Sequence, residues 1–413
     1  MIAVIGGGII GTTTALALQK RGIQTTLIDC GLPGMATSFG NAGVLSESSI
    51  IVVNNPHILP KLPKLLFGKD TGLKLDAKFV LTHLPWILNF LKNATEEKMI
   101  VAAKALRALQ LLSLAIHKDL LEEAGDDTIL VAGGMLKLYR SLKGFEAAQK
   151  ERDFFEKMGV SFTSYFGEEI QELEPSLNPI YAAGTLMDET YSVMSPLKLT
   201  QAYFELYKKY GGKFSQTEIS GISPTGNGGW NLSSKEGRQV TADGIVIAAG
   251  PWSPVIGEMI GYTIPMVWER GYHVNVEPSA AGALNRPIHD VEKAYVMTSI
   301  ENHVRVLSGV ELAHRDSKPN YRQINNALKS ARQASDIGNK IDAEPWFGSR
   351  PTMPDSLPVV GAAPRHKNIW FNFGHQHIGL STSTGCAKLL ADMIEGKIIS
   401  DDFNAFSAQR FKM

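Results

Sequence analysis

The sequence predicts an α/β fold in which a domain with a parallel sheet is interleaved with a second domain of the α+β type. Three observations predict it. The chain opens with a strand, a glycine turn, a helix and a second strand, which form a βαβ unit. Segments typical of the same sheet return in the middle of the chain and near its end. Helical and antiparallel patterns fill the stretches between them, so we expect two discontinuous domains.

The opening unit is specified by short-range signals. A buried strand is expected at Ile2–Ile5, followed by three glycines and a helix over residues 10–20. Gly22 ends the helix, and the β-branched run Thr25–Asp29 predicts the second strand. Leu- and Lys-rich sequence with helical spacing then predicts a helical insertion over residues 59–121, with helices at 63–67, 78–91 and 96–121.

The rest of the chain mixes helices with short strands. Residues 129–139 predict two strands that turn at Gly133 and Gly134, and residues 227–229 predict a hairpin turn. Further helices are expected at 144–158, 168–174, 196–210 and 325–338. Further strands are expected at 213–222, 230–232, 240–249, 272–276, 294–299 and 304–309. The chain closes with a strand at 369–373, a glycine-containing loop and a helix at 381–395.

Composition excludes several classes of protein. The 413 residues are enough for two or three domains with a sizeable core. Lys and Arg number 41, as do Asp and Glu, so the net charge is zero and gives no support to a nucleic-acid binder. Two cysteines cannot form a disulfide framework.

The sequence also predicts where the protein resides. The first strand starts directly after Met1 without a basic leader, which is unlike a secretory signal. The stretch most similar to a membrane span, residues 102–121, is interrupted by Lys104, Arg107, His117, Lys118 and Asp119. We expect a cytoplasmic protein, and peripheral attachment to the inner face of the cytoplasmic membrane stays open.

A glycine motif points to a dinucleotide. Gly6, Gly8 and Gly11 are spaced as GxGxxG between the first strand and the first helix, and Asp29 ends the next strand. Such glycines let the backbone approach a pyrophosphate at a helix N-terminus, and the carboxylate accepts hydrogen bonds from a ribose. No Arg or Lys follows Asp29 closely, which argues against NADP. The motif alone does not separate FAD from NAD.

Five further stretches resemble the D-amino-acid oxidase-like (DAO) family of flavoenzymes, and most of all its bacterial D-amino-acid dehydrogenase branch. They are TSFGNAG at 37–43, DGIVIAAG at 243–250, RGYH at 270–273, GSRPTMPD at 348–355 and GHQHIGL at 374–380. The resemblance implies an FAD cofactor and a Rossmann-like FAD-binding domain of the glutathione-reductase type.

The resemblance, together with the order of elements, predicts the domain boundaries. The FAD-binding domain is expected to comprise residues 1–60, 141–175, 192–265 and 345–413. The substrate domain, with a mixed or antiparallel sheet, is expected to comprise residues 61–140, 176–191 and 266–344.

Arg350 is the candidate for substrate binding. A guanidinium group suits bidentate capture of an α-carboxylate, and the neighbouring Gly348 and Pro351 give it a stiff setting. The resemblance to glycine oxidase implies the same role for Arg350, and it implies that Tyr295 positions the substrate. His377 is expected to contact substrate or to tune the flavin. Tyr272, in the 270–273 stretch, is a further candidate for the substrate pocket. For Tyr295 and Tyr272, a place in the core is an open alternative.

Small residues of the 37–43 stretch are expected beside the flavin ring. The 374–380 loop is expected at the pyrimidine side of the flavin. There the N-terminus of the following helix favours negative charge. His375 also has a structural interpretation. The predicted cofactor contacts are Gly6, Gly8, Ile9, Ile10, Gly11, Asp29, Ser38, Asn41, Ala42, Gly43, Ala249, Gly250, Trp252, Gly348, Arg350, Gly374, His375, His377, Ile378, Gly379 and Leu380.

The FAD is expected to be bound without a covalent link. Sarcosine-oxidase relatives carry a linking cysteine near the Arg-Pro motif, whereas Ser349 and Met353 flank it here, and Cys30 and Cys386 lie elsewhere. No CxxC or HExxH spacing is present, so no metal is expected.

The predicted reaction is the oxidation of a D-amino acid, or of a D-proline- or hydroxyproline-like imino acid. Hydride transfer from Cα to flavin N5 would give an imine, then a 2-oxo acid or a cyclic imine. Residues 44–55, Pro85-Trp86 and the 270–273 stretch resemble the D-hydroxyproline dehydrogenase subgroup. A glycine- or sarcosine-type amine oxidase and a flavin-binding subunit of a larger complex are alternatives. The electron acceptor (a quinone, a dye-type carrier or oxygen) and the oligomeric state stay open.

Overall fold

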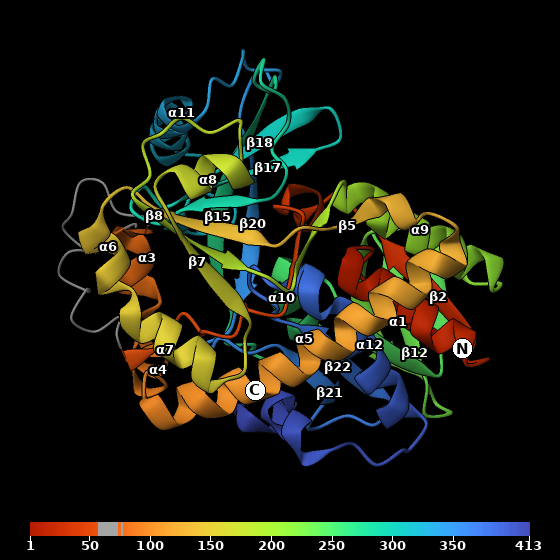
Figure 1. Cartoon of the computed structure of the whole chain (residues 1–413). Coiled ribbons are helices and arrows are strands. Elements are labelled where there is room, and N and C mark those ends of the chain that lie inside the picture. The colour runs from red at the N-terminus through yellow and green to blue at the C-terminus, as the bar shows by residue number, and fades with distance from the viewer. Residues whose placement is uncertain (57–72, 76) are drawn as a thin grey trace.

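The computed structural model describes residues 1–56, 73–75 and 77–413. The helix expected at 63–67 lies outside these residues. Two sheets dominate the described part of the chain: a six-stranded, mainly parallel sheet and a larger, mainly antiparallel one (Figure 1). The predicted α/β fold class with a mixed second sheet is confirmed.

The six-stranded sheet is assembled from three separate parts of the chain. Its strands pair in parallel, except that the edge strand β21 is antiparallel to β22. The central strands are apolar on both faces, as is typical of a parallel sheet covered on both sides. The order is β10 (Lys213–Gln216), β2 (Thr25–Asp29), β1 (Ile2–Ile5), β14 (Gly244–Ile247), β22 (Ile369–Phe373) and β21 (Val359–Ala362).

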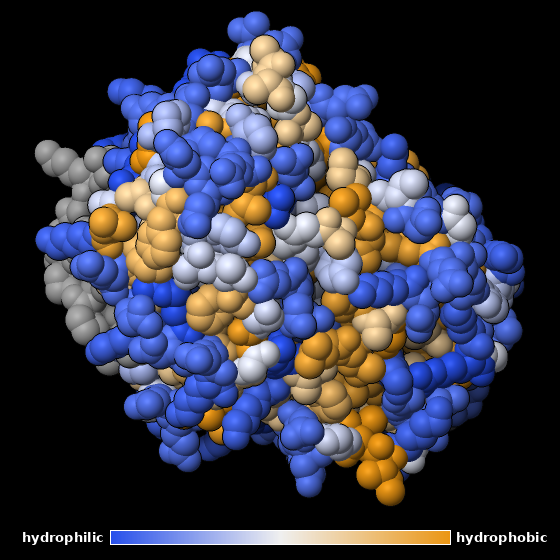
Figure 2. Space-filling model, viewed as in Figure 1, coloured by the Kyte–Doolittle hydropathy of each residue, from blue (hydrophilic) through white to orange (hydrophobic). Residues whose placement is uncertain are grey.

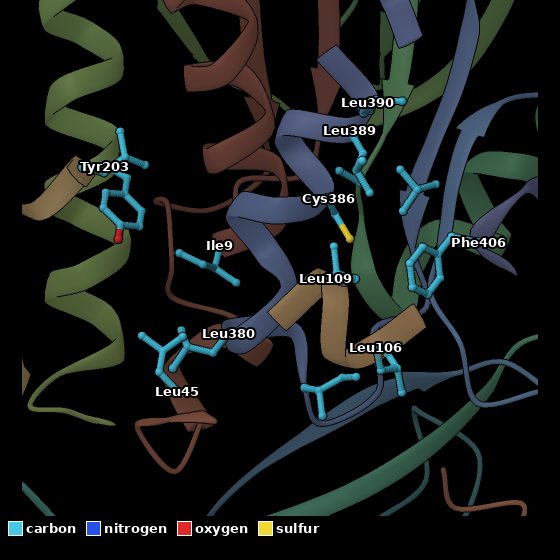
Figure 3. Close-up of a cluster of buried hydrophobic side chains, with 14 of the residues drawn as sticks. Ile9, Leu45, Leu106, Leu109, Tyr203, Leu380, Cys386, Leu389, Leu390 and Phe406 are labelled. Atoms are coloured by element: carbon cyan, nitrogen blue, oxygen red, sulfur yellow. The ribbon is translucent and has the colours of Figure 1, made fainter. Parts of the chain in front are cut away.

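Four helices cover one face of this sheet and form the largest hydrophobic cluster. They are α1 (Ile9–Lys20), α5 (Glu96–Ala124), α9 (Pro196–Lys209) and α12 (Gly379–Ile394). Figure 3 shows Leu106 and Leu109 of α5 facing Cys386 and Leu389 of α12. The opposite face packs against a hairpin sheet of β11 (Ile219–Pro224), β12 (Trp230–Ser234) and β13 (Gln239–Ala242).

Helix α5 is the one helix among the described residues that is long and apolar enough to cross a membrane. Half of its apolar stretch is buried inside the molecule. Its buried residues pack against α12 and α9, which is the arrangement of a core helix. On the face of the molecule seen in Figure 2, hydrophilic residues predominate and apolar residues form patches among them, notably in its lower part.

The larger sheet has ten strands. It runs β4 (Leu73–Leu75), β19 (Val310–Leu312), β15 (Val267–Val276), β18 (His303–Leu307), β17 (Tyr295–Ile300), β16 (Ile288–Asp290), β6 (Met135–Tyr139), β8 (Ala183–Met187) and β7 (Phe162–Phe166), and β20 (Trp346–Thr352) also pairs with β15. Helix α11 (Arg322–Ala334) packs Ile324 and Leu328 against one face, together with Tyr272, Val274 and Met297.

The remaining elements are short. The strands β3 (Val44–Ser46), β9 (Thr190–Val193) and β5 (Leu130–Ala132) form a separate small sheet. The helices are α3 (Ala77–Thr82), α4 (Leu84–Lys92), α6 (Leu142–Ala147), α7 (Gln149–Lys157), α8 (Glu168–Leu173) and α10 (Ser253–Glu258).

The structure corrects four local expectations. The strand expected at 240–249 is two strands in different sheets, β13 and β14. The helix expected at 78–91 is two helices, α3 and α4. The strands expected to pair across Gly133 and Gly134 do not pair with each other: β5 joins β9, and β6 joins β8 and β16. The single helix expected over 144–158 is two helices, α6 and α7, which meet at Ala148.

Three segments also pack differently from the predicted division into domains. Helix α5, expected in the substrate domain, packs on the layer of α1 and α12, because its apolar stripe matches theirs. Residues 141–175, expected in the FAD-binding domain, contribute β7 to the ten-stranded sheet. Strand β20 also belongs to that sheet through its pairing with β15.

Candidate active site

A cavity of about 830 Å³ lies where the carboxyl ends of β1 and β14 and the N-terminus of α1 approach the ten-stranded sheet. Residues from both ends of the chain line it. Openings at the carboxyl ends of parallel strands are the usual ligand sites of such sheets.

The glycine motif forms the floor of this cavity. Gly6 has a φ of +114°, and a Cβ there would lie 2.4 Å from the carbonyl oxygen of Ala248. A Cβ on Gly11 would lie 1.7 Å from the carbonyl oxygen of Gly6, so only glycine lets α1 begin this close to β1. Gly6 and Gly8 line the cavity, whereas Gly11 lies behind them as a packing position.

Two polar side chains hold this floor in place. The Asp29 carboxylate accepts hydrogen bonds from the amide N–H groups of Gly7, at 2.5 Å, and Gly31, at 2.8 Å. The Ser38 hydroxyl accepts the amide N–H of Ile9, at 3.0 Å, in the first turn of α1. Asp29 and Ser38 therefore both reach the backbone that would meet a pyrophosphate.

The 374–380 loop closes the cavity from the C-terminal end of the chain. His375 is bonded at both ring nitrogens, to Asn372 and to Thr382, each at 3.0 Å, and Asn372 donates to Thr14 of α1 at 2.9 Å. Burial lowers the pKa of His375 to about 3, so the ring is neutral. The structural interpretation of His375 therefore fits its contacts, and the loop is fixed relative to α1.

Arg350 lies on β20 opposite Glu269 of β15. Its guanidinium passes over Gly271, where a Cβ would lie 2.4 Å from Nη2. It forms no hydrogen bond or ion pair with any residue that the structure describes, and it lines the cavity. Burial lowers the pKa of Arg350, and the nearby Glu269 carboxylate counteracts this effect. Arg350 is thus a cation with donors available to a ligand.

His377 projects into the same cavity. Although its side chain is exposed to the open cavity, desolvation by the surrounding protein and, to a smaller extent, the charge of Arg350 lower the pKa of His377 to about 4. The imidazole is therefore neutral at pH 7 and presents one donor and one acceptor.

The predicted tyrosines direct their hydroxyl groups elsewhere. Tyr272 and Tyr295 border the cavity, but their side chains alternate to the other face of the sheet. The Tyr272 hydroxyl donates to Glu311 at 2.5 Å. The Tyr295 hydroxyl lies 3.2 Å from that of Tyr181 and also meets α11. Their contacts fit the core interpretation that the sequence left open.

Most of the predicted cofactor contacts are brought together. The cavity is lined by Gly6, Gly8, Ile9, Ile10, Asp29, Ser38, Asn41, Ala42, Ala249, Gly250, Trp252, Gly348, Arg350, His375, His377, Ile378, Gly379 and Leu380. Gly11, Gly43 and Gly374 lie outside this lining and have backbone or packing roles. Gly43 and Gly374, for example, have positive φ angles of +66° and +80°.

Sequence reasoning missed a residue that positions the 37–43 loop. Arg305 of β18 donates from Nη1 to the carbonyl oxygens of Phe39, at 2.8 Å, and Asn41, at 3.0 Å. Burial lowers the pKa of Arg305 to about 10. A buried arginine on a strand leaves no signal in the sequence that distinguishes it from an exposed one.

The sequence also gave no sign that Lys137 of β6, Glu151 of α7 and His289 of β16 line the same cavity. Lys137 and Glu151 form an ion pair, and the Lys137 ammonium lies 5.1 Å from the ring centre of Phe155. His289 forms no side-chain hydrogen bond with any residue in the described part of the chain.

These features fit FAD. The glycines leave room for a pyrophosphate at the N-terminus of α1, and the Asp29 carboxylate suits a ribose. At the other end of the cavity, the N-terminus of α12 favours negative charge on the cofactor. A family model described as "FAD dependent oxidoreductase" matches residues 1–393. The chain belongs to the DAO family. FAD is its cofactor.

Relatives within the DAO family cover almost the whole chain. A D-amino-acid oxidase from Bradyrhizobium diazoefficiens is 30% identical, covering 99% of this chain and 98% of its own. A D-amino acid dehydrogenase from Paramagnetospirillum magneticum is 29% identical over the same shares. Among solved structures, glycine oxidase from Geobacillus kaustophilus shares the fold with a TM-score of 0.77 at 21% identity, covering 100% of this chain and 99% of its own.

The two cysteines bear on how FAD is held. Cys386 is buried in the cluster of Figure 3. Cys30 is exposed and follows Asp29 at the edge of the cavity. Neither belongs to the stretch around Arg350, and non-covalent attachment of FAD stays a prediction.

Proposed function

We propose that this DAO-family protein oxidises a D-amino acid, or a D-proline- or hydroxyproline-like imino acid, to the corresponding imine. The observation that supports it most is Arg350: a cation in the cofactor cavity whose guanidinium has no bonded partner among the described residues. An α-carboxylate fits this group, because two parallel N–H···O bonds satisfy both partners at once.

The chain's own residues supply orientation and electrostatics. Arg350 holds the carboxylate. The absence of a side chain at Gly271 leaves room for its guanidinium, and the absence of one at Gly348 leaves room for the Trp346 ring. His377, neutral at pH 7, offers an acceptor to the substrate amine without adding a second positive charge near Arg350. Holding the substrate in one orientation lowers the barrier by removing its freedom beforehand.

When bound, FAD supplies the oxidising power by accepting a hydride from the substrate carbon that bears the amine. Water outside the site then hydrolyses an imine from a primary amine to a 2-oxo acid and ammonia, whereas an imine from a proline analogue stays cyclic. Names of relatives support a D-configured substrate: two of them are a D-amino-acid oxidase and a D-amino acid dehydrogenase.

The deciding experiment follows the flavin absorbance of the purified holoprotein while substrates are added one at a time without oxygen. The panel contains the D- and L-forms of alanine, proline and 4-hydroxyproline isomers, together with glycine and sarcosine. We expect bleaching by D-forms and not by their L-forms.

Bleaching by glycine and sarcosine alone would favour the amine-oxidase alternative. A holoprotein that none of these compounds reduces would contradict the proposal. Repeating the active reaction with oxygen, and then with a quinone under nitrogen, identifies the acceptor.

A further inference from the structure

Glu269 is a buried carboxyl group next to the proposed substrate anchor. It is 4% exposed and lies on β15, directly across from Arg350 on β20 and from Leu312 on β19. Direct cross-strand partners point to the same face of a sheet, so Glu269 and Arg350 share one face. Figure 1 shows β15 and β20 side by side in this sheet. Arg350 lines the cavity, whereas Glu269 lies outside the lining.

The other surroundings of the Glu269 carboxyl suit a charge poorly. Val267, two residues away on the same face, and Leu312 pack in an apolar cluster with side chains of α3 and α4. Oε2 of Glu269 and the hydroxyl of Thr352, which lies across from Val267, both lack a hydrogen-bond partner in the described part of the chain. Burial raises the pKa of Glu269, and the charge of Arg350 and the hydroxyl of Thr352 lower it to a smaller extent.

A carboxylate bound to Arg350 changes this balance of charge. Without a ligand, the guanidinium offsets the charge of Glu269. With a ligand, one guanidinium faces two carboxylates, and a second negative charge at the same site strongly favours protonation of one of them. The ligand keeps its charge, because two N–H···O bonds from Arg350 stabilise it. Oε2 of Glu269 has no such bond and gains the proton instead.

We propose that Glu269 takes up one proton from the solvent when a carboxylate binds Arg350, and releases it when the ligand leaves. Glu269 is then a positioning residue that acts through Arg350 and sets how strongly the site attracts an anion at a given pH. His377, another titratable side chain near Arg350, is neutral at pH 7. The inference rests on the proposed function, because it takes Arg350 as the anchor of the substrate carboxylate.

Proton uptake makes the affinity for a carboxylate depend on pH. Well below the pKa of Glu269 in the free protein, the group is already protonated, so pH has no effect on binding. Above that pKa, each ligand brings a proton with it, and the dissociation constant rises about tenfold per pH unit. The rise ends above the pKa of Glu269 in the complex, where the ligand binds beside an ionised Glu269.

Cyclopentanecarboxylate, a proline analogue without the nitrogen, tests the proposal on the oxidised holoprotein. It has no amine to be oxidised, and it stays ionised throughout the range from pH 6.5 to 9. Calorimetric titrations in two buffers of different ionisation enthalpy give the number of protons taken up per ligand. We expect wild type to take up protons within this range, rising towards one per ligand. The uncharged cyclopentanecarboxamide should cause no uptake.

Variants of two buried carboxyl groups identify the group that takes the proton. Glu269→Gln should abolish the uptake and, at pH 9, bind cyclopentanecarboxylate at least about tenfold more tightly than wild type, because Arg350 no longer faces a second carboxylate. A merely structural role predicts weaker binding instead. Glu269→Asp, which keeps a carboxyl, should keep the uptake. Glu311→Gln is the matched control: Glu311 is buried across from Arg270, on the other face of β15, and this variant should also keep the uptake.

The absence of proton uptake in wild type at every pH tested, or uptake that persists in Glu269→Gln, would overturn the inference. If Glu269→Gln does not hold FAD, infrared difference spectra of wild type with ¹³C-labelled ligand decide. Conversion of a protein carboxylate to a carboxylic acid supports the inference, and its absence contradicts it. Binding that is unchanged in Arg350→Ala contradicts the proposed function, whereas binding lost there without proton uptake in wild type contradicts this inference alone.

Discussion

At the scale of single residues, the site is organised by two opposite charges on neighbouring strands. Glu269 is 4% exposed and faces Arg350 across the β15–β20 pair. Burial raises the pKa of the Glu269 carboxyl, although the Arg350 charge acts in the other direction. Within the described part of the chain, Glu269 forms no hydrogen bond or ion pair with Arg350, so the donors of the guanidinium stay available to a ligand.

Replacing Arg350 tests its role directly. Arg350→Ala removes the only bidentate carboxylate partner we propose, so kcat/KM for the best substrate should fall roughly 100-fold, mainly through KM. Arg350→Lys keeps the charge but loses the planar fork, and it should recover only part of the loss. Steady-state kinetics give both numbers. An unchanged KM in Arg350→Ala would show that Arg350 does not bind the substrate carboxylate.

For Tyr295 we expect a loss of stability and no effect on substrate binding. Its hydroxyl contacts Tyr181 and the Ser330 carbonyl oxygen on the face away from the cavity. Tyr295→Phe should therefore cost about 1 kcal/mol of stability and leave KM within twofold of wild type. Chemical unfolding and steady-state kinetics on the same preparation check the two effects. A large rise in KM with unchanged stability would restore Tyr295 as a substrate contact.

At the scale of elements, the two domains are connected through a loop as well as through the cavity. The 37–43 loop belongs to the FAD-binding part, yet Arg305 of the ten-stranded sheet holds it by two backbone carbonyl groups. Trp346 packs so closely on Gly40 that a Cβ there would lie 1.9 Å from its ring. The substrate sheet therefore orders a loop that we expect beside the flavin.

Removing Arg305 should loosen the cofactor. In Arg305→Ala the carbonyl groups of Phe39 and Asn41 lose a charged donor, and the FAD dissociation constant should rise between about 10- and 100-fold. The fluorescence of released FAD on dilution measures it. Arg238→Ala, which changes an exposed arginine, is the matched control. If both variants hold FAD equally well, Arg305 has no part in ordering the loop.

At the scale of the whole molecule, a buried polar network joins three helices beneath the cofactor. His117 of α5 bonds the Tyr203 hydroxyl of α9 at 2.6 Å and the Leu380 carbonyl oxygen at the start of α12 at 3.0 Å. Burial lowers the pKa of His117 to about 4 from its ordinary value of 6.5. The folded protein thus holds a neutral imidazole that the unfolded chain protonates more readily.

Stability should therefore fall with acidification. The contribution of neutral His117 is fully present above pH 6.5 and is lost as the pH falls towards 4, at up to about 1.4 kcal/mol per pH unit. Urea midpoints at pH 7 and 5 should show a smaller drop in His117→Asn than in wild type. His314→Asn, at an exposed histidine, should keep the wild-type drop. Equal drops in all three proteins would contradict this account.

The sequence by itself determined those features of the fold and of the site that short stretches of chain encode. The βαβ unit, the glycine turn, Asp29 and the 374–380 loop each require local backbone geometry that a few consecutive residues encode. The same holds for the membership in the DAO family and for Arg350, which stands in a short motif. None of these features depends on a contact between distant parts of the chain.

The tertiary structure alone decided which way side chains point and which distant strands meet. In a strand, a shift of one residue moves a side chain to the other face, so Tyr272 and Tyr295 could not be assigned from composition or periodicity. Lys137 and His289 are neighbours across β6 and β16 although about 150 residues separate them in the chain. Which strands pair depends on residues that are far apart in the chain, and this pairing brings Lys137 and His289 together at the cavity.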